Sequence, residues 1–329
     1  MRSRRQFLAS ALAVAGSASM QDFAFGQERY PSKPIRMIVP HPPGGGVDII
    51  ARNLSEGLRG VLGQTIVVEN HPGANGMIGA QLASVAPADG YTLVMDGPGE
   101  IVIAPHIFKS MTYNPAKDLQ PITLCSNAPN VLVVGPSTPV NTLPELIALA
   151  KANPGKLTFG SSGIGNIQHL NGELFNKLAG VSTTHVPYKG AAPQMTDIIG
   201  GQINMGYTSV AAALPMIKGG KLRPLAVTSR ERVPQLPDVP ALAETPALAS
   251  YDLNNWFGLF APAGLPAPIL SRVHDAVVVV LNQPKMKNSI IEGGAIPAPM
   301  PVEQFEAFLV AQSQTFARIV KEANITAES

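Results

Sequence analysis

The chain contains 329 residues, of which 24 are lysine or arginine and 22 are aspartate or glutamate. This near balance argues against the strongly basic surface of a nucleic-acid-binding protein. Cys125 is the single cysteine, so an intramolecular disulfide is excluded. The length is sufficient for two domains of about 150 residues each.

Residues 1–26 have the pattern of a twin-arginine export signal. The sequence SRRQFL at positions 3–8 opens an apolar segment that is too short to remain as a membrane anchor. The segment holds three of the basic residues and one of the acidic residues, so the rest of the chain carries 21 of each. We expect the signal to be removed, leaving a neutral, soluble protein in the periplasm. A disordered basic tail is the alternative.

Short apolar runs alternate with amphipathic runs through the rest of the chain. The pattern predicts strands at 35–40, 65–70, 91–96, 130–135, 157–162, 184–188, 203–208, 221–229 and 254–264. It predicts helices at 49–63, 75–86, 143–153, 167–180, 192–201, 266–282, 284–292 and 302–323. The Pro-rich segment 234–250 is expected to be an ordered surface connection.

Strands joined through helices are typical of parallel pairing, with helices packed on the sheet. We therefore predict an α/β fold with two lobes, each built on a mixed or parallel sheet, and a hinge beside a central ligand cleft. The first lobe is expected to comprise residues 27–127 and 252–329, and the second residues 128–251.

Three glycine-rich corners lead from a predicted strand into a predicted helix, at 40–48, 71–76 and 160–166. The free N–H groups at a helix N-terminus attract an anion, and glycine lets that anion approach the backbone closely. Ligands of open α/β sheets bind beyond the carboxyl ends of strands, where such corners lie. We expect the corners to meet at the cleft; any one alone could be a simple turn.

The corners do not match nucleotide-binding or hydrolase motifs. The triplet GGG at 44–46 is followed by Val47 and Asp48, where a P-loop requires Gly-Lys-Ser/Thr. The sequence GIGNIQ at 163–168 lacks the last small residue of the dinucleotide fingerprint, and GSSG at 160–163 does not fit Gly-x-Ser-x-Gly. Ser161 and Ser162 are therefore expected to act as hydrogen-bond donors.

The histidines do not have metal-ligand spacing, and one cysteine makes no thiolate cluster, so we expect neither a metal site nor a cofactor. His41 lies in the first corner and is expected to donate a hydrogen bond to an anion, with a surface histidine as the alternative. His169 follows the third corner by one turn and is expected to support it. Asp48 is expected to cap its helix or brace the loop. The corners hold no pair of carboxylates that would suggest acid–base chemistry. Trp256 and Phe257 are expected to pack in the core or hinge.

Eight segments, in order along the chain, resemble a known family. They are PIRMIVPHPPGGGVDIIAR, VVENHPGANGMIGA, PADGYTL, NPGKLTFGSSGIGNIQHLNGELF, THVPYKGAAPQMTDIIGGQI, GKLRPLAVTS, LPDVPALAE and WFGLFAPAGLP. From residue 31 onward the chain is similar to the Bug family, the extracytoplasmic solute receptors of tripartite tricarboxylate transporters.

The resemblance implies a two-domain periplasmic-binding-protein fold, type II-like, that closes over a small organic carboxylate. A di- or tricarboxylate or an aromatic acid is the implied ligand, and membrane transporter subunits are the implied partners of a monomeric, non-enzymatic receptor. A partner of a membrane kinase is one alternative. A secreted hydrolase using Ser162 with His169 is another, although no acid partner for it is evident.

The resemblance also implies which residues bind the ligand. In the corners these are His41, Pro43, Gly44, Gly45, Asp48, Ala74, Ser161, Ser162, Gly163 and Gly165. Elsewhere they are Gly97, His169, Tyr188 and Thr208, while the orientation of Lys189 is left open. The family commonly has an aromatic residue at the position of His41 and an acid at that of Thr208. An added donor and a missing acid favour a carboxylate without an amino group.

Overall fold

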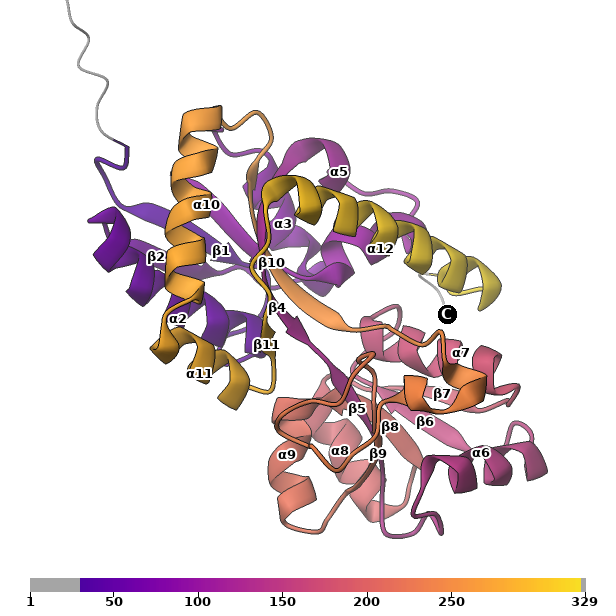
Figure 1. Cartoon of the computed structure of the whole chain (residues 1–329). Coiled ribbons are helices and arrows are strands. Elements are labelled where there is room, and N and C mark those ends of the chain that lie inside the picture. Colours follow the sequence, from indigo (N-terminus) through magenta and orange to yellow (C-terminus); the bar gives the residue numbers. More distant parts are fainter. Residues whose placement is uncertain (1–29, 327–329) are drawn as a thin grey trace, which may run out of the picture.

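The computed structural model describes residues 30–326, which form two lobes, each built on its own β-sheet (Figure 1). The predicted export signal lies outside the described residues. In the first sheet the strand order is β2 (Ile66–Asn70), β1 (Ile35–Val39), β3 (Thr92–Asp96), β10 (Asn255–Pro262), β4 (Leu119–Ala128) and β11 (Ile296–Pro297). In the second it is β7 (Thr184–Pro187), β6 (Thr158–Ser161), β8 (Met205–Ser209), β5 (Asn130–Val134) and β9 (Arg223–Val227).

The two sheets follow one plan. Strands β2, β1 and β3 pair in parallel, and β10 then runs antiparallel to β3. Strands β7, β6 and β8 likewise pair in parallel, and β5 runs antiparallel to β8. Both sheets are therefore mixed, and the predicted two-lobed α/β architecture is confirmed. In each sheet the parallel strands carry their glycine-rich corners at one edge.

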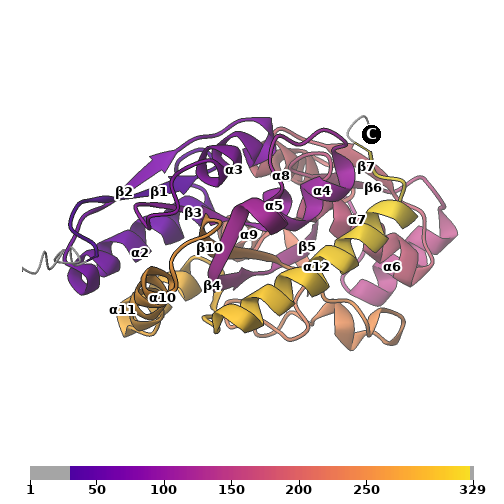
Figure 2. The same ribbon diagram turned by 90° about the horizontal axis from the view of Figure 1, so that it is seen from above.

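Helices cover both sheets (Figure 2). In the first lobe they are α2 (Gly46–Leu62), η1 (Ala74–Gly76), α3 (Met77–Ser84), the π-helix η2 (Gly99–Ile103), α4 (Ala104–Ile107), α5 (Pro115–Asp118), α10 (Ala267–Leu281), α11 (Pro284–Glu292) and α12 (Val302–Glu322). In the second they are α6 (Leu143–Ala152), α7 (Ile167–Ala179), α8 (Ala191–Gly200), α9 (Val210–Lys218), η3 (Leu242–Glu244) and η4 (Pro246–Leu248).

Helix α2 illustrates the local rules. Its buried face carries Ile50, Leu54 and Leu58, spaced by four residues as an amphipathic helix requires. It ends at Gly63, whose φ of 73° lets its N–H bond to the carbonyl of Arg59. The helix starts three residues before the prediction, at the last glycine of the triplet.

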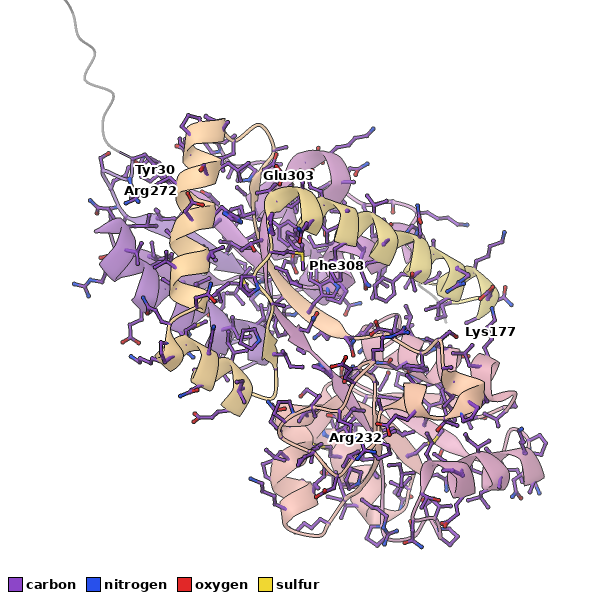
Figure 3. All side chains as sticks on the ribbon, viewed as in Figure 1. Tyr30, Lys177, Arg232, Arg272, Glu303 and Phe308 are labelled. Atoms are coloured by element: carbon purple, nitrogen blue, oxygen red, sulfur yellow. The ribbon has the colours of Figure 1, made fainter. Side chains whose placement is uncertain are left out.

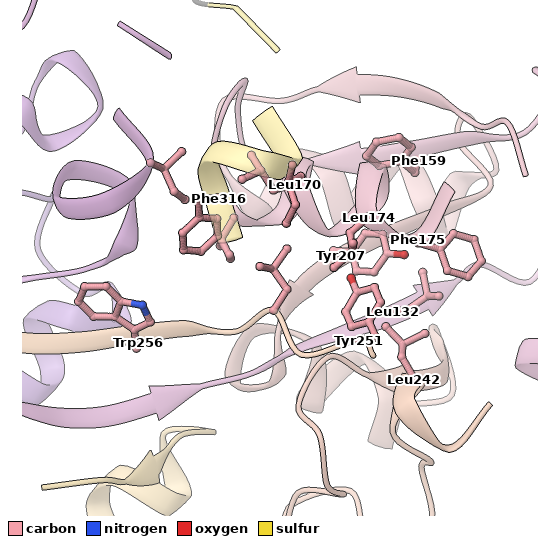
Figure 4. Close-up of a cluster of buried hydrophobic side chains, with 14 of the residues drawn as sticks. Leu132, Phe159, Leu170, Leu174, Phe175, Tyr207, Leu242, Tyr251, Trp256 and Phe316 are labelled. Carbon is pink, nitrogen blue, oxygen red and sulfur yellow. The ribbon is translucent and has the colours of Figure 1, made fainter. Parts of the chain in front are cut away.

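Helix α12 connects the two lobes: it starts on the first and ends against α7 of the second (Figure 1). Phe316 and Ile319 of α12 belong to one buried cluster with Leu170 and Leu174 of α7, part of which is drawn in Figure 4. At the end of the contact Lys177, labelled in Figure 3, forms an ion pair with Glu322. The core therefore continues from one lobe into the other along this helix.

Some elements were not predicted: β4, β11, α5, α9, the short helices of residues 99–107, and η3 and η4. Strand β4 contains Pro121, which usually argues against a central strand. The structure accommodates it because β11 pairs with β4 only at Ser126 and Asn127, so the outer edge beside Pro121 is free. The Pro-rich segment is ordered, as expected, but not superficial, since Leu242 and Leu248 are fully buried.

Candidate functional site

A cavity of about 300 Å³ lies between the lobes and is lined by both. The second lobe contributes residues 162–166 of the third corner and the first two residues of α7. The first lobe contributes His41, Asn75, Met77, Gly97, Pro98, Gly99, Glu100, Ala104, Phe108, Asn255 and Phe257. None of the described residues that line the cavity is a lysine or an arginine.

Asp48 braces the first corner from behind. Its Oδ2 accepts hydrogen bonds from the Gly44 N–H at 2.9 Å and from Arg52 at 3.0 Å, and its Oδ1 accepts one from Asn70 at 2.9 Å. Burial raises the pKa of Asp48, but these hydrogen bonds lower it by more. The predicted bracing role is confirmed. Asn70 also donates to the carbonyl of His41 at 3.0 Å, which fixes the backbone of that residue.

His41 belongs to a cluster with two buried acids. Its Nε2 lies 3.1 Å from Glu100 Oε1, and the His41 side chain is 37% exposed while that of Glu100 is 3% exposed. Asp96 is fully buried, and its Oδ1 accepts a hydrogen bond from the Gly97 N–H at 2.7 Å. We call His41, Glu100 and Asp96 the charged wall of the cavity.

The acids and the imidazole set one another's charge. Burial lowers the pKa of His41, but the Glu100 carboxylate raises it by more. Burial raises the pKa of Glu100, but the charge and hydrogen bond of His41 lower it by more. Burial and the neighbouring Glu100 raise the pKa of Asp96 well above its usual range. The contact between His41 and Glu100 therefore favours an imidazolium and a carboxylate in the wall, and burial favours a neutral Asp96.

The ligating atoms of the three residues lie within 4.8 Å of one another, near enough to hold a metal ion, and form the one such group between residues 30 and 326. Spacing along the sequence could not indicate this, because His41 lies in a segment far from the one that carries Asp96 and Glu100. A proton on His41 and a proton on Asp96 leave the three side chains with no net charge, and His41 contacts Glu100 directly. The geometry therefore does not require a metal.

A glycine makes room for the buried Glu100. A Cβ atom on Gly76 would lie 1.9 Å from Glu100 Oε1, and Gly76 has a φ of 88°, which disfavours other residues. Tyr113 donates a hydrogen bond to the Glu100 carbonyl at 3.1 Å. The second corner therefore serves partly to accommodate an acid that follows β3.

Asn166 organises the third corner. Its Oδ1 caps α7 by accepting the N–H groups of Gln168 at 3.1 Å and His169 at 3.0 Å. Its Nδ2 donates to Ser162 Oγ at 2.9 Å, and the Ser162 N–H donates to Gln168 Oε1 at 2.8 Å. The corner is thus tied to the first turn of α7, whose N-terminal end faces the cavity.

Two stacked histidines lie behind this corner. The rings of His169 and His185 are parallel within 9°, with centroids 3.7 Å apart. The Gly165 N–H donates to His169 Nδ1 at 3.1 Å, and Ser161 Oγ lies 2.7 Å from His185 Nε2. Burial, followed by the His185 charge, lowers the pKa of His169 to about 3, and burial lowers that of His185 to about 4. Both rings are neutral at pH 7, and His169 supports the corner as predicted. We call the third corner, together with His169 and His185 behind it, the neutral wall of the cavity.

The structure brings five predicted site residues to the cavity lining: His41, Gly97, Ser162, Gly163 and Gly165. The other predicted residues lie outside the lining. Pro43, Gly44 and Gly45 are exposed, and Asp48 and Ala74 lie in the first and second corners. Ser161 and His169 lie behind the third corner. Tyr188 donates a hydrogen bond to Asp197 at 2.8 Å, and Thr208 is buried in β8. Lys189 is exposed.

Sequence reasoning missed several lining residues. Trp256 is buried in the core, as expected, but Phe257 lines the cavity, because successive side chains of β10 point to opposite faces. The acids Asp96 and Glu100 were also missed. The available signal was two acids four residues apart, one at the end of a buried strand and the other just after it.

Fold and cavity together define a two-lobed solute-binding receptor. Residues 50–325 match the family described as the tripartite tricarboxylate transporter family receptor. The chain belongs to this family, and the resemblance to Bug proteins is confirmed.

Two relatives match over nearly their whole length. BugT of Bordetella pertussis is 33% identical over 312 residues, which cover 94% of each chain. A protein of the tcbD-tcbE intergenic region of Pseudomonas sp. strain P51 is 33% identical over 325 residues, 98% of this chain and 96% of its own.

Solved structures agree with the fold. A protein of R. palustris with adipate is 32% identical, with a TM-score of 0.81, over 90% of this chain and 99% of its own. MatC of Rhodopseudomonas palustris with bound malate is 28% identical, with a TM-score of 0.76, over 88% of this chain and 100% of its own. The periplasmic binding protein BugD is 32% identical, with a TM-score of 0.77, over 90% of this chain and 99% of its own. The fold is thus that of periplasmic solute-binding receptors, as predicted.

Proposed function

We propose that the protein is a periplasmic receptor that captures a small organic carboxylate between its lobes and delivers it to a tripartite tricarboxylate transporter. The observation that carries this proposal is the cavity itself. One wall presents the His41 cation, and the other presents the backbone of residues 162–166 and the N-terminal end of α7. Backbone N–H groups and a helix dipole attract a carboxylate without a lysine or arginine.

The proposed ligand is a dicarboxylate or an aromatic acid. Adipate and malate are the ligands of two similar structures. A cavity of about 300 Å³ is at the lower end of the range for ligand sites, which suits a molecule of that size. Asn75, Asn166 and Asn255 offer amide groups to a second polar end, and Phe108 and Phe257 offer apolar surface between the ends.

We propose that binding closes the lobes about the segments that connect them. The chain passes between the sheets at Pro129, where β4 ends and β5 begins, and again between β9 and β10. Across the cleft, Gly165 lies so near α4 that a Cβ atom would be 2.8 Å from Ile107 Cδ1. Such a close approach is expected of a closed arrangement.

A thermal-shift screen of mono-, di- and tricarboxylates and aromatic acids tests this proposal. A ligand at a hundredfold excess over its dissociation constant stabilises the folded state by about 2.7 kcal/mol. His41→Phe should weaken binding of the best ligand by roughly tenfold or more, since it removes a charged hydrogen bond. Lys285→Ala, on α11 and outside the cavity lining, is the control and should bind as the unmodified protein does. Absence of stabilisation by every compound would contradict the proposal.

The cellular part of the proposal has its own test. No helix of residues 30–326 is long and apolar enough to cross a membrane. We propose that the exported protein works as a monomer with membrane transporter subunits. Uptake of the bound carboxylate by membrane vesicles that contain those subunits should depend on added receptor, and uptake that is independent of it would argue for a sensing role.

A further inference from the structure

The charged wall contains two acids that no lysine or arginine reaches. The groups that act on Asp96 and Glu100 are each other, His41 and backbone N–H groups. Both acids are buried, and the Asp96 Oδ2 atom has no donor among the described hydrogen bonds. Its neighbour is the Glu100 carboxylate, which is an acceptor. Two buried carboxylates in contact cannot both be ionised, so one proton must be held between them.

The surroundings decide where that proton resides. Glu100 contacts the cation of His41 at 3.1 Å, which favours a charged carboxylate. Asp96 accepts one backbone N–H from Gly97 and has no cation of its own. Asp96 therefore retains the proton, its O–H donates a hydrogen bond to Glu100, and Glu100 remains negative toward His41.

We propose that Asp96 and Glu100 are positioning residues that keep His41 a cation at the cavity wall, where it contacts the carboxylate of the ligand. For the identity of the anion this inference rests on the proposed function. For the charge of His41 it rests on the geometry of the three side chains alone. The sequence between Asp96 and Glu100 then has a purpose: the turn Gly97-Pro98-Gly99 returns the second acid to the first.

Replacing each acid by its amide should have a different effect on His41. Asp96 acts as a neutral donor, so Asp96→Asn supplies an N–H in place of the carboxyl O–H and leaves the charge of Glu100 intact. Glu100 acts through its charge, so Glu100→Gln retains its size but removes the partner of His41. A merely structural role would make these two near-isosteric amides equivalent.

The groups that face His41 are few. Glu100 approaches from η2 and Asp96 from the end of β3, while Asn70 of β2 bonds to the backbone of His41 and not to its ring. Tyr113 reaches the backbone of Glu100 and not its carboxylate. Anion affinity should therefore fall as the pH rises through the raised pKa of His41, and in Glu100→Gln that fall should occur at lower pH.

Two measurements test the inference: an NMR titration of the His41 ring, assigned by its absence in His41→Gln, and calorimetry with adipate between pH 5.5 and 8.5. We expect a His41 pKa above 6.5 in the unmodified protein and in Asp96→Asn, and a lower one in Glu100→Gln. At pH 7.5, adipate binding should weaken roughly tenfold to a hundredfold in Glu100→Gln and recover at pH 5.5. Asp96→Asn should stay within about threefold of the unmodified protein.

The inference is overturned if Asp96→Asn lowers the His41 pKa as much as Glu100→Gln does, or if His41 titrates at or below its ordinary pKa in the unmodified protein. It is also overturned if a chelator abolishes adipate binding and zinc restores it, because a metal ion would then occupy the wall. Failure of adipate and of every other carboxylate to bind would remove the proposed function, whereas the NMR titration would still decide the charge of His41.

Discussion

The two walls of the cavity use the same residue type in opposite states. His41 lies in a glycine-rich corner at the carboxyl end of a parallel strand, and His169 lies in α7 one turn after another such corner. His41 contacts a carboxylate, which raises its pKa, whereas His169 stacks on another imidazole in a buried site, and its pKa falls to about 3. Burial opposes a charge on both rings, and only at His41 does a neighbouring carboxylate outweigh it.

This difference assigns separate tasks to the lobes. The first lobe supplies the side-chain cation of the cavity. The second supplies the third corner and the N-terminal end of α7, which its neutral histidine and Asn166 hold in place. A ligand carboxylate between them would interact with a charge on one side and oriented dipoles on the other, so each wall can be perturbed separately.

The largest expected effect comes from crowding the charged wall. Gly76→Ala places a Cβ against Glu100 and imposes a positive φ on alanine, so we expect a loss of about 2–5 kcal/mol in the free energy of unfolding. Gly44→Ala is the matched control, because Gly44 also has a positive φ, of 84°, but its Cβ would meet nothing within 4 Å. It should lose about 1–3 kcal/mol. Equal losses in urea unfolding would show that Glu100 is not confined as described.

The next largest effect concerns the pH dependence of stability, which the histidines of the two walls should alter in different pH ranges. The folded state resists protonation of His169, so stability falls as the pH drops below about 6.5 toward 3, by up to about 1.4 kcal/mol per pH unit. His169→Gln removes that part of the slope. His41 gains a proton more readily when folded, so its contribution is complete below about 6.5 and is lost as the pH rises through its raised pKa.

His41→Gln should therefore change the slope only above pH 6.5, and by less, because the ring is 37% exposed and its interaction is screened. The two variants serve as controls for each other in urea unfolding measured from pH 4 to 9. If both altered the slope in the same pH range, the opposite charge states of the walls would be disproved.

A smaller effect is expected from the cap of the neutral wall. Asn166→Ala should cost about 1 kcal/mol of stability and weaken carboxylate binding, since it releases both α7 and Ser162. Thr142→Ala removes the cap of α6 away from the cavity, where Thr142 accepts the Glu145 N–H. It should cost a similar stability and leave binding unchanged. Unchanged binding in Asn166→Ala would mean that the third corner does not hold the ligand.

Local patterns in the sequence carried the prediction of the fold and of the supporting role of His169, whereas the stacking of His185 on it was not predicted. Alternating apolar runs indicate strands and helices wherever burial follows a regular period, and Asp48 and His169 act on residues four positions away. β4 escaped prediction because its Pro121 is tolerated only where the neighbouring strand is too short to reach it.

The charged wall could not be predicted in this way. His41 and Glu100 are 59 positions apart in the sequence, and the parallel pairing of β1 with β3 brings them together. Glu100 also requires Gly76, which belongs to a third segment. Interactions that depend on sheet register and on a missing Cβ leave no periodic signal in the sequence. The sequence therefore showed the acids only as two carboxylates near the end of a strand.

The most direct test of the account is a crystal structure with the carboxylate that most raises the melting temperature. We predict that one carboxylate oxygen lies within hydrogen-bond distance of the His41 imidazole, and that the third corner and the N-terminal end of α7 contact the ligand from the other wall. A ligand bound outside the cavity, or an imidazole turned toward solvent and away from it, would contradict the account.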